Sequence, residues 1–206
     1  MIRVHRWHLL FTLGIILSHT CLQAAERNII VFVTDDESPT LGCYGDTAAV
    51  TPAVDALAKD GALFINAFAT TASCSASRSV ILSGLHNHAN GQYGHQHDFH
   101  KFSSWYDVAS FSLPRALARA GYRTARIGKY HVAPESVYHF ETELNGPTRN
   151  AVVMADRCKD YITADHEKPF FLYFATSDPH RGGGVDATSK LTLKPDLFGN
   201  KPNHGS

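Results

Sequence analysis

The sequence lacks an excess of charge of either sign. Its 206 residues carry 19 lysines and arginines against 19 aspartates and glutamates, and no basic run stands out. Nucleic acid is therefore not expected as a partner, because its recognition requires a concentrated positive surface. The sequence also lacks internal repeats and low-complexity segments. With 44% hydrophobic and 11% aromatic residues, its composition is that of a globular protein with a sizeable core.

The chain also lacks a hydrophobic stretch long enough for a confident membrane span. An apolar run covers residues 7–17, after a positive start at residues 3–6 and before small residues at 24–25. This layout predicts a secretory signal peptide over residues 1–25, since the run is short for a membrane span. An N-terminal anchor or a buried strand is the alternative interpretation. We expect export to a periplasmic, extracellular or lysosome-like compartment, without stable membrane insertion.

Cysteine is scarce. Cys21 lies within the predicted signal peptide, so Cys43, Cys74 and Cys158 remain. An odd count in an exported protein raises the question of a reactive or modified thiol. Cys43 and Cys158 are candidates for a disulfide, but sequence alone does not establish the pairing.

The hydrophobic pattern predicts alternating strands and helices. Three apolar segments are typical of buried strands, at residues 28–33, 122–127 and 169–176. One helix is predicted at 52–60, where Thr51 and Pro52 form a start signal, and another at 113–120, before Gly121. Such alternation indicates an α/β domain with a largely parallel sheet flanked by helices.

Each predicted strand is followed by charged or histidine residues. Asp35 and Asp36 follow the first strand, Lys129 and His131 the second, and His180 the third. In open parallel sheets, ligands bind beyond the carboxyl ends of the strands. We therefore expect these side chains to form one site.

Asp35 and Asp36 are candidate metal ligands. Two adjacent carboxylates at a buried strand end are costly unless positive charge neutralises them. A divalent cation with oxygen ligands does this, with Ca²⁺ as the first candidate and Mg²⁺ as the second. A helix cap or a solvated turn is the competing interpretation, because turns are rich in aspartate.

A second motif begins at Cys74. Small polar residues lead through Arg78 into an apolar stretch that ends at Gly84, which predicts a loop entering a short helix. Near a helix N-terminus and Arg78, negative charge on the thiol or on a bound anion is favoured. For a lone cysteine the alternative is a small buried hydrophobe.

Histidine is abundant, with 13 residues. His95, His97 and His100 cluster with Asp98, at a spacing also seen in zinc sites. No second cluster in the sequence completes a ligand set, so we interpret these histidines as surface or pocket-lining residues.

The segment that begins at Cys74 resembles the sulfatase signature, in which Cys-x-Pro-x-Arg precedes a hydrophobic stretch ending in Thr-Gly. Cys74, Arg78 and Gly84 match the signature. Ala76 replaces its proline, and Ser83 replaces its threonine. Further segments are similar to the family in the same order, at 28–36, 51–64, 121–131 and 170–180. By this resemblance the chain is identified as a member of the sulfatase family, within the alkaline-phosphatase superfamily.

Stretches outside the signature resemble the sulfamidase (heparan N-sulfatase) branch of the family, at residues 66–68, 74–78, 90–94, 128–135 and 178–181. The resemblance implies hydrolysis of a sulfate ester or sulfamate on a sulfated carbohydrate. Family members are considerably longer and supply a later Asp-Asn pair to the metal. We therefore expect residues 26–206 to be an incomplete N-terminal catalytic domain with weak metal binding and little activity of its own.

The resemblance also implies the chemistry of the nucleophile. A maturase would oxidise Cys74 to formylglycine, and one hydroxyl of its hydrated form would attack sulfur to give a covalent sulfo-enzyme. Asp35, Asp36 and the modified Cys74 would bind the divalent metal, and Arg78 would hold the nucleophile. The aerobic formylglycine-generating enzyme favours proline at the position of Ala76, whereas radical-type maturases tolerate alanine there.

The remaining candidate residues would act on the sulfate. By the resemblance, Lys129 and His180, together with Arg181, bind its oxygens, and His131 assists removal of a proton from the second hydroxyl. Substitution of Arg78 or Lys129 with alanine is expected to impair turnover more than folding. Two alternatives stay open: an exported non-catalytic protein that binds sulfated glycans, and a phosphoryl-ester hydrolase of the same superfamily.

Overall fold

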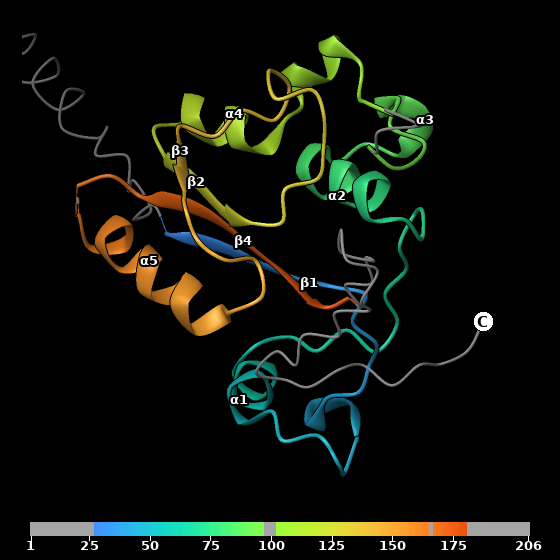
Figure 1. Cartoon of the computed structure of the whole chain (residues 1–206), viewed down its shortest axis with the longest axis vertical. Coiled ribbons are helices and arrows are strands. Elements are labelled where there is room, and N and C mark those ends of the chain that lie inside the picture. Colours follow the sequence, from blue (N-terminus) through green and yellow to red (C-terminus); the bar gives the residue numbers. More distant parts are fainter. Residues whose placement is uncertain (1–26, 97–101, 165–166, 181–206) are drawn as a thin grey trace, which may run out of the picture.

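A four-stranded parallel sheet forms the centre of the molecule in the computed structural model, which describes residues 27–96, 102–164 and 167–180 (Figure 1). Its strands are β1 (Ile29–Asp35), β2 (Arg123–Gly128), β3 (Thr142–Leu144) and β4 (Phe170–Pro179). Their order across the sheet is β1-β4-β2-β3, and every pair is parallel. The predicted α/β fold with a parallel sheet is confirmed. The predicted signal peptide lies outside the described residues.

The helices lie between the strands in sequence. They are α1 (Pro52–Asp60), α2 (Cys74–Ser83), α3 (Asn87–Asn90), α4 (Leu113–Arg119) and α5 (Ala151–Thr163), with 3-10 turns η1 (Gly42–Tyr44) and η2 (Tyr106–Ser110). The helix predicted at 52–60 has those bounds, and the one predicted at 113–120 differs by one residue. The strand predicted at 169–176 continues to Pro179, because its last residues still run beside the end of β1.

Strand β4 lies in the middle of the sheet and is buried on both faces. Because side chains alternate along a strand, Phe171, Tyr173 and Ala175 belong to a core cluster that includes Leu82 of α2. Phe170, Leu172 and Phe174 belong to a second cluster, which also contains Met154 and Cys158 of α5. Helices α2 and α4 therefore lie on one face of the sheet and α5 on the other, as Figure 1 shows.

Two other findings bear on the sequence predictions. Cys43, Cys74 and Cys158 are free thiols, so the candidate Cys43–Cys158 disulfide is not formed in the structure. In the described part of the chain, no helix has the length and apolar character needed to cross a membrane.

Candidate active site

The carboxyl ends of the neighbouring strands β1, β4 and β2 bring the candidate residues together, as their parallel arrangement predicts. Asp35 is the last residue of β1, and Lys129 follows directly after β2. The backbone N–H of Lys129 donates to the carbonyl of Ala175 in β4, with an N···O distance of 2.7 Å. This bond fixes the start of the loop after β2 against the neighbouring strand.

Asp35 is buried and has two cationic partners. Its Oδ1 accepts a hydrogen bond from Nη2 of Arg78 at 3.1 Å, and its Oδ2 accepts one from Nζ of Lys129. Asp36, by contrast, is exposed, with a left-handed backbone conformation at φ 58°. From the sequence, both carboxylates are expected to require neutralisation, and the structure assigns that requirement to Asp35.

Arg78 is the buried centre of this network, with 2% of its surface exposed. Besides Asp35, its Nη1 donates to the carbonyl of Lys129 at 2.8 Å and to the hydroxyl of Tyr173 at 3.2 Å. One guanidinium thus joins α2 to the ends of β1 and β2 and to the middle of β4. From the sequence, Tyr173 was predicted only to belong to an apolar strand.

The balance of burial and charge lowers the pKa of Asp35. Burial alone would raise that pKa, but the hydrogen bonds and charges of Lys129 and Arg78 outweigh it. The folded-state pKa lies below the ordinary value of 3.8. The contribution of the ionised carboxylate to the stability of the fold is therefore fully present above pH 3.8. The contribution is lost as the pH falls through the lower folded-state pKa.

The lowered pKa of Asp35 can be tested with the variant Asp35→Asn. We expect the difference in free energy of unfolding between the chain and this variant to stay constant from neutral pH down to about pH 5, and to shrink only below about pH 4. Urea unfolding at a series of pH values measures it. The exposed change Asp60→Asn is the matched control, with an effect within about 0.5 kcal/mol. A difference that already shrinks above pH 5 would contradict a lowered pKa.

His180 follows β4 and lies beside both aspartates. Its Nδ1 is 2.5 Å from Oδ2 of Asp36 and 4.0 Å from Oδ2 of Asp35. Arg149 holds the segment in place, because its Nη1 donates to the carboxylate of Asp178 at 2.7 Å and to the carbonyl of His180 at 2.8 Å. Sequence reasoning missed Arg149, which lies before α5 with no local motif to mark it.

Cys74 is the first residue of α2, as the sequence predicted. Burial raises the pKa of its thiol; Lys129 lowers it, and the charges of Asp35 and Asp36 raise it further. The unmodified side chain is therefore a thiol at neutral pH and a poor nucleophile. One ligand atom from each of Asp35, Asp36 and Cys74 lies within 4.8 Å of the other two.

A buried polar network fixes the first turns of α2. The Asn87 amide donates to the carbonyls of Ala76 and Gln92 at 2.9 and 2.8 Å, and the Asn90 amide donates to the Ser79 hydroxyl at 3.0 Å. Ala76 and Ser79 are fully buried, so small side chains let α3 approach α2 closely. The helix that presents Cys74 is thereby held rigidly.

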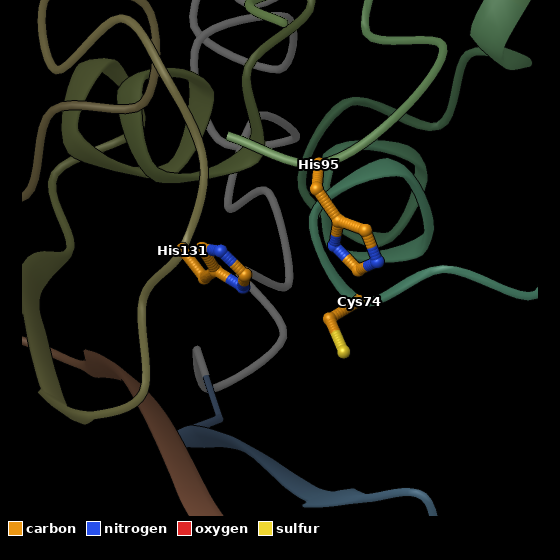
Figure 2. Close-up of side chains that lie close together, drawn as sticks. All are labelled: Cys74, His95 and His131. Atoms are coloured by element: carbon orange, nitrogen blue, oxygen red, sulfur yellow. The ribbon is translucent and has the colours of Figure 1, made fainter. Parts of the chain in front are cut away.

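Two histidines also lie close to Cys74. Figure 2 shows His95 and His131 beside the cysteine, each from a different loop. Their rings stack with centroids 5.8 Å apart, and one ligand atom from each of the three residues lies within 4.8 Å of the others. His131 was expected here, and His95, interpreted from the sequence as a surface or pocket-lining residue, lies half-buried beside Cys74. His97, His100 and Arg181 lie outside the described residues.

The donor set at the strand ends fits a hard divalent cation. One carboxylate oxygen of Asp35 and one of Asp36 lie within 4.8 Å of each other, and Asp36 is exposed, so an ion can reach it. Oxygen donors of this kind are what Ca²⁺ and Mg²⁺ prefer. Lys129 and Arg78 already form ion pairs with the Asp35 carboxylate, so a bound cation would share that carboxylate with them.

Comparison with known proteins decides the family. The family model described as Sulfatase matches residues 27–191. The chain belongs to the sulfatase family. Human N-sulphoglucosamine sulphohydrolase is 43% identical over 168 residues, which cover 78% of this chain and 33% of the relative. An ulvan-active sulfatase of Formosa agariphila is 35% identical over 162 residues, covering 74% of this chain and 30% of the relative.

A solved structure supports the sulfatase fold. It is a complex with the substrate D-glucosamine-2-N,6-O-disulfate, matched with a TM-score of 0.60 and 26% identity over 77% of this chain and 35% of that one. The sulfatase-family chain thus spans about a third of the length of the relatives it matches.

Proposed function

We propose that the protein is an exported hydrolase of sulfuric esters or sulfamates on a sulfated carbohydrate, with a formylglycine nucleophile derived from Cys74. The observation that supports this is the convergence of Cys74 at the start of α2 with Asp35 and Lys129 at two strand ends. Cys74, Asp35 and Lys129 come from segments more than 30 residues apart, yet they share one edge of the sheet.

The roles of the basic residues follow from their positions. Lys129 Nζ is part-buried beside Asp35, where a cation stabilises charge that develops on sulfuryl oxygens. His180 lies at the same edge and would bind a further oxygen. His131 lies beside Cys74 and would accept a proton from the converted side chain.

The metal and the maturase complete the proposal. Asp35 and Asp36 would hold a divalent cation, Ca²⁺ or Mg²⁺, which supplies Lewis-acid polarisation of the sulfuryl oxygens. A formylglycine-generating maturase would act on the exported precursor before folding buries Ala76, which is fully buried in the structure.

The names of the relatives narrow the substrate class. One is named for N-sulphoglucosamine, and the solved complex holds a glucosamine with both N- and O-sulfate. A sulfated glucosamine is therefore the first substrate to test. On one converted preparation, the N-sulfated, 6-O-sulfated and matched phosphorylated sugars separate sulfamidase, sulfate esterase and phosphoryl-ester hydrolase.

Mass spectrometry of the exported protein tests the proposal directly. We expect the tryptic peptide with residue 74 to have the mass of formylglycine when the chain is made in a host with a maturase, because the signature around Cys74 and Arg78 is present. Cys43 in the same sample is the internal control and is expected to stay a thiol.

Ala76→Pro is the variant that separates a maturation defect from a wrong assignment. Residue 76 lies in the first turn of α2, where backbone N–H groups have no intrahelical partner, so proline costs no helix hydrogen bond there. We expect this variant to be converted at least as fully as the native sequence by the aerobic enzyme. A cysteine that stays unmodified in both proteins would overturn the proposal and favour a glycan-binding role.

A further inference from the structure

We propose that the unconverted chain binds a zinc ion through Cys74, His95 and His131. These three side chains form a second group of ligand atoms, separate from the two aspartates except for the shared cysteine (Figure 2). The proposal concerns the precursor thiol and adds a metal site that the hydrolytic function does not require.

The geometry is close to that of a zinc site. One ligand atom from each residue lies within 4.8 Å of the other two. Around a tetrahedral zinc ion, with bonds of about 2.3 Å to sulfur and about 2.0 Å to nitrogen, ligand atoms lie roughly 3.3–3.8 Å apart. The upper limit of 4.8 Å exceeds that spacing by about 1 Å, a shift that side-chain rotations can supply.

The backbone around each ligand is already fixed. The N–H of Gln96 donates to the Ser75 hydroxyl at 3.0 Å, which ties the loop of His95 to the first turn of α2 beside Cys74. Val132, next to His131, is buried in the core cluster beneath α2. The three ligands therefore meet with little loss of backbone freedom on binding, which favours metal affinity.

The chemistry of the donors selects the metal. A thiolate and two imidazoles suit Zn²⁺, whereas carboxylates suit Ca²⁺ and Mg²⁺. Cys74 belongs to both groups, so the state of this one side chain determines which ion the site prefers. Zinc binding needs only release of the thiol proton to solvent, and it leaves a fourth position for water.

A consequence for maturation rests on the proposed function. Conversion of Cys74 to formylglycine removes the sulfur and with it the zinc site. Zinc bound to the precursor would in turn withhold the thiol from any oxidising or alkylating reagent. Because conversion is proposed to precede folding, zinc would bind only those chains that fold with Cys74 unconverted.

Cobalt titration of the full chain tests the site, because Co²⁺ bound to a thiolate gives a charge-transfer absorption in the near ultraviolet. The protein is made in a host without a maturase, and its mass confirms the cysteine at position 74. We expect one Co²⁺ per chain, displaced by Zn²⁺. Cys74→Ser should abolish the band, and His95→Gln should weaken binding by more than about 100-fold, beyond the loss typical of an outer-shell partner.

His88→Asn is the matched control. His88 is exposed and its ring stacks on that of His86, so this pair is the natural place for non-specific metal binding on the described surface. We expect the variant to bind cobalt as the native chain does, with unchanged far-ultraviolet circular dichroism in all three variants. Binding that is lost in His88→Asn, or that persists in His95→Gln, would show an adventitious surface site and overturn the proposal.

Alkylation gives a readout that does not depend on spectroscopy. With Zn²⁺ present, Cys74 should be protected from iodoacetamide while Cys43, which is half-buried on η1, is not. The two proposals fail separately. A precursor that binds no zinc but is converted to formylglycine overturns only the zinc site, whereas a zinc-binding chain that is never converted overturns only the hydrolase.

Discussion

Gly128→Ala is expected to lower the free energy of unfolding by about 2–5 kcal/mol, the sum of left-handed backbone strain of about 1–2 kcal/mol and overpacking of about 1–3 kcal/mol. Gly128 ends β2 with φ 86°, and a Cβ atom there would lie 2.0 Å from the carbonyl oxygen of Ala175 and 2.7 Å from Cε of Met154. The first contact involves backbone, which cannot rotate away. The two strands would have to separate.

The same change would disturb the site. The carbonyl that a new Cβ would strike also accepts the N–H of Lys129. Displacing it moves Lys129 away from Asp35, so ion binding at the strand ends is expected to weaken together with stability. Glycine at this position is therefore required by the close approach of the two strands.

Gly121→Ala is the matched control. Gly121 also has a positive φ, of 94°, but a Cβ there would meet no heavy atom within 4 Å. We expect the free energy of unfolding of this variant to fall only by the cost of left-handed backbone strain, about 1–2 kcal/mol. Urea unfolding of both variants measures the difference. Equal losses in the two variants would show that the contact with Ala175 is relieved by a small shift and would remove the steric argument.

Local sequence signals account for the elements that were predicted. Helix α1 has Pro52 at its start and Gly61 after its end, and both signals act within a few residues. Strands β1 and β4 are both continuous apolar runs, which is why both were predicted to be buried. Strand β4 is buried, but the prediction is wrong for β1, which lies at the edge of the sheet with Ile30 and Phe32 more than half exposed. Since parallel strands end at one edge, the positions of Asp35 and Lys129 followed from the strand assignments alone.

Strand β3 and helix α5 are among the elements that were missed, for different reasons. Strand β3 has only three residues, Thr142–Leu144, which is too short for a hydrophobic pattern to mark it in the sequence. It is defined by its pairing with β2. Helix α5 did offer a signal. Asn150 caps its first turn by accepting the N–H of Val153, and Met154 and Cys158 are spaced to face the sheet.

The contacts within the site required the tertiary structure. The Arg78 guanidinium reaches the hydroxyl of Tyr173, which is 95 residues away in the sequence. His95 reaches Cys74 only because the Ser75 hydroxyl holds the loop that follows α3. No periodicity or spacing in the sequence marks such partners, whereas the identity of the strand-end residues was readable from their positions.

Arg78→Ala is expected to destabilise the fold by about 3–5 kcal/mol, the range for removing one partner of a buried ion pair. Arg78 is 2% exposed, and its loss leaves the buried Asp35 with Lys129 as a close cationic partner, while Nδ1 of His180 lies 4.0 Å from Oδ2 of Asp35. It also removes the bonds that join α2 to the strand ends. The sequence alone suggested that turnover would suffer more than folding; because Arg78 is buried, we now expect a large loss of stability as well.

Arg119→Ala provides the comparison, because Arg119 is exposed at the end of α4 and donates a single bond to the carbonyl of Ser110. We expect a loss within about 0.5 kcal/mol for this surface change. Urea unfolding of both variants at neutral pH decides the matter. If Arg78→Ala unfolds as the native chain does, the guanidinium does not hold α2 against the sheet. Its presence in the signature would then have to be explained by charge stabilisation at the nucleophile, as the sequence analysis first supposed.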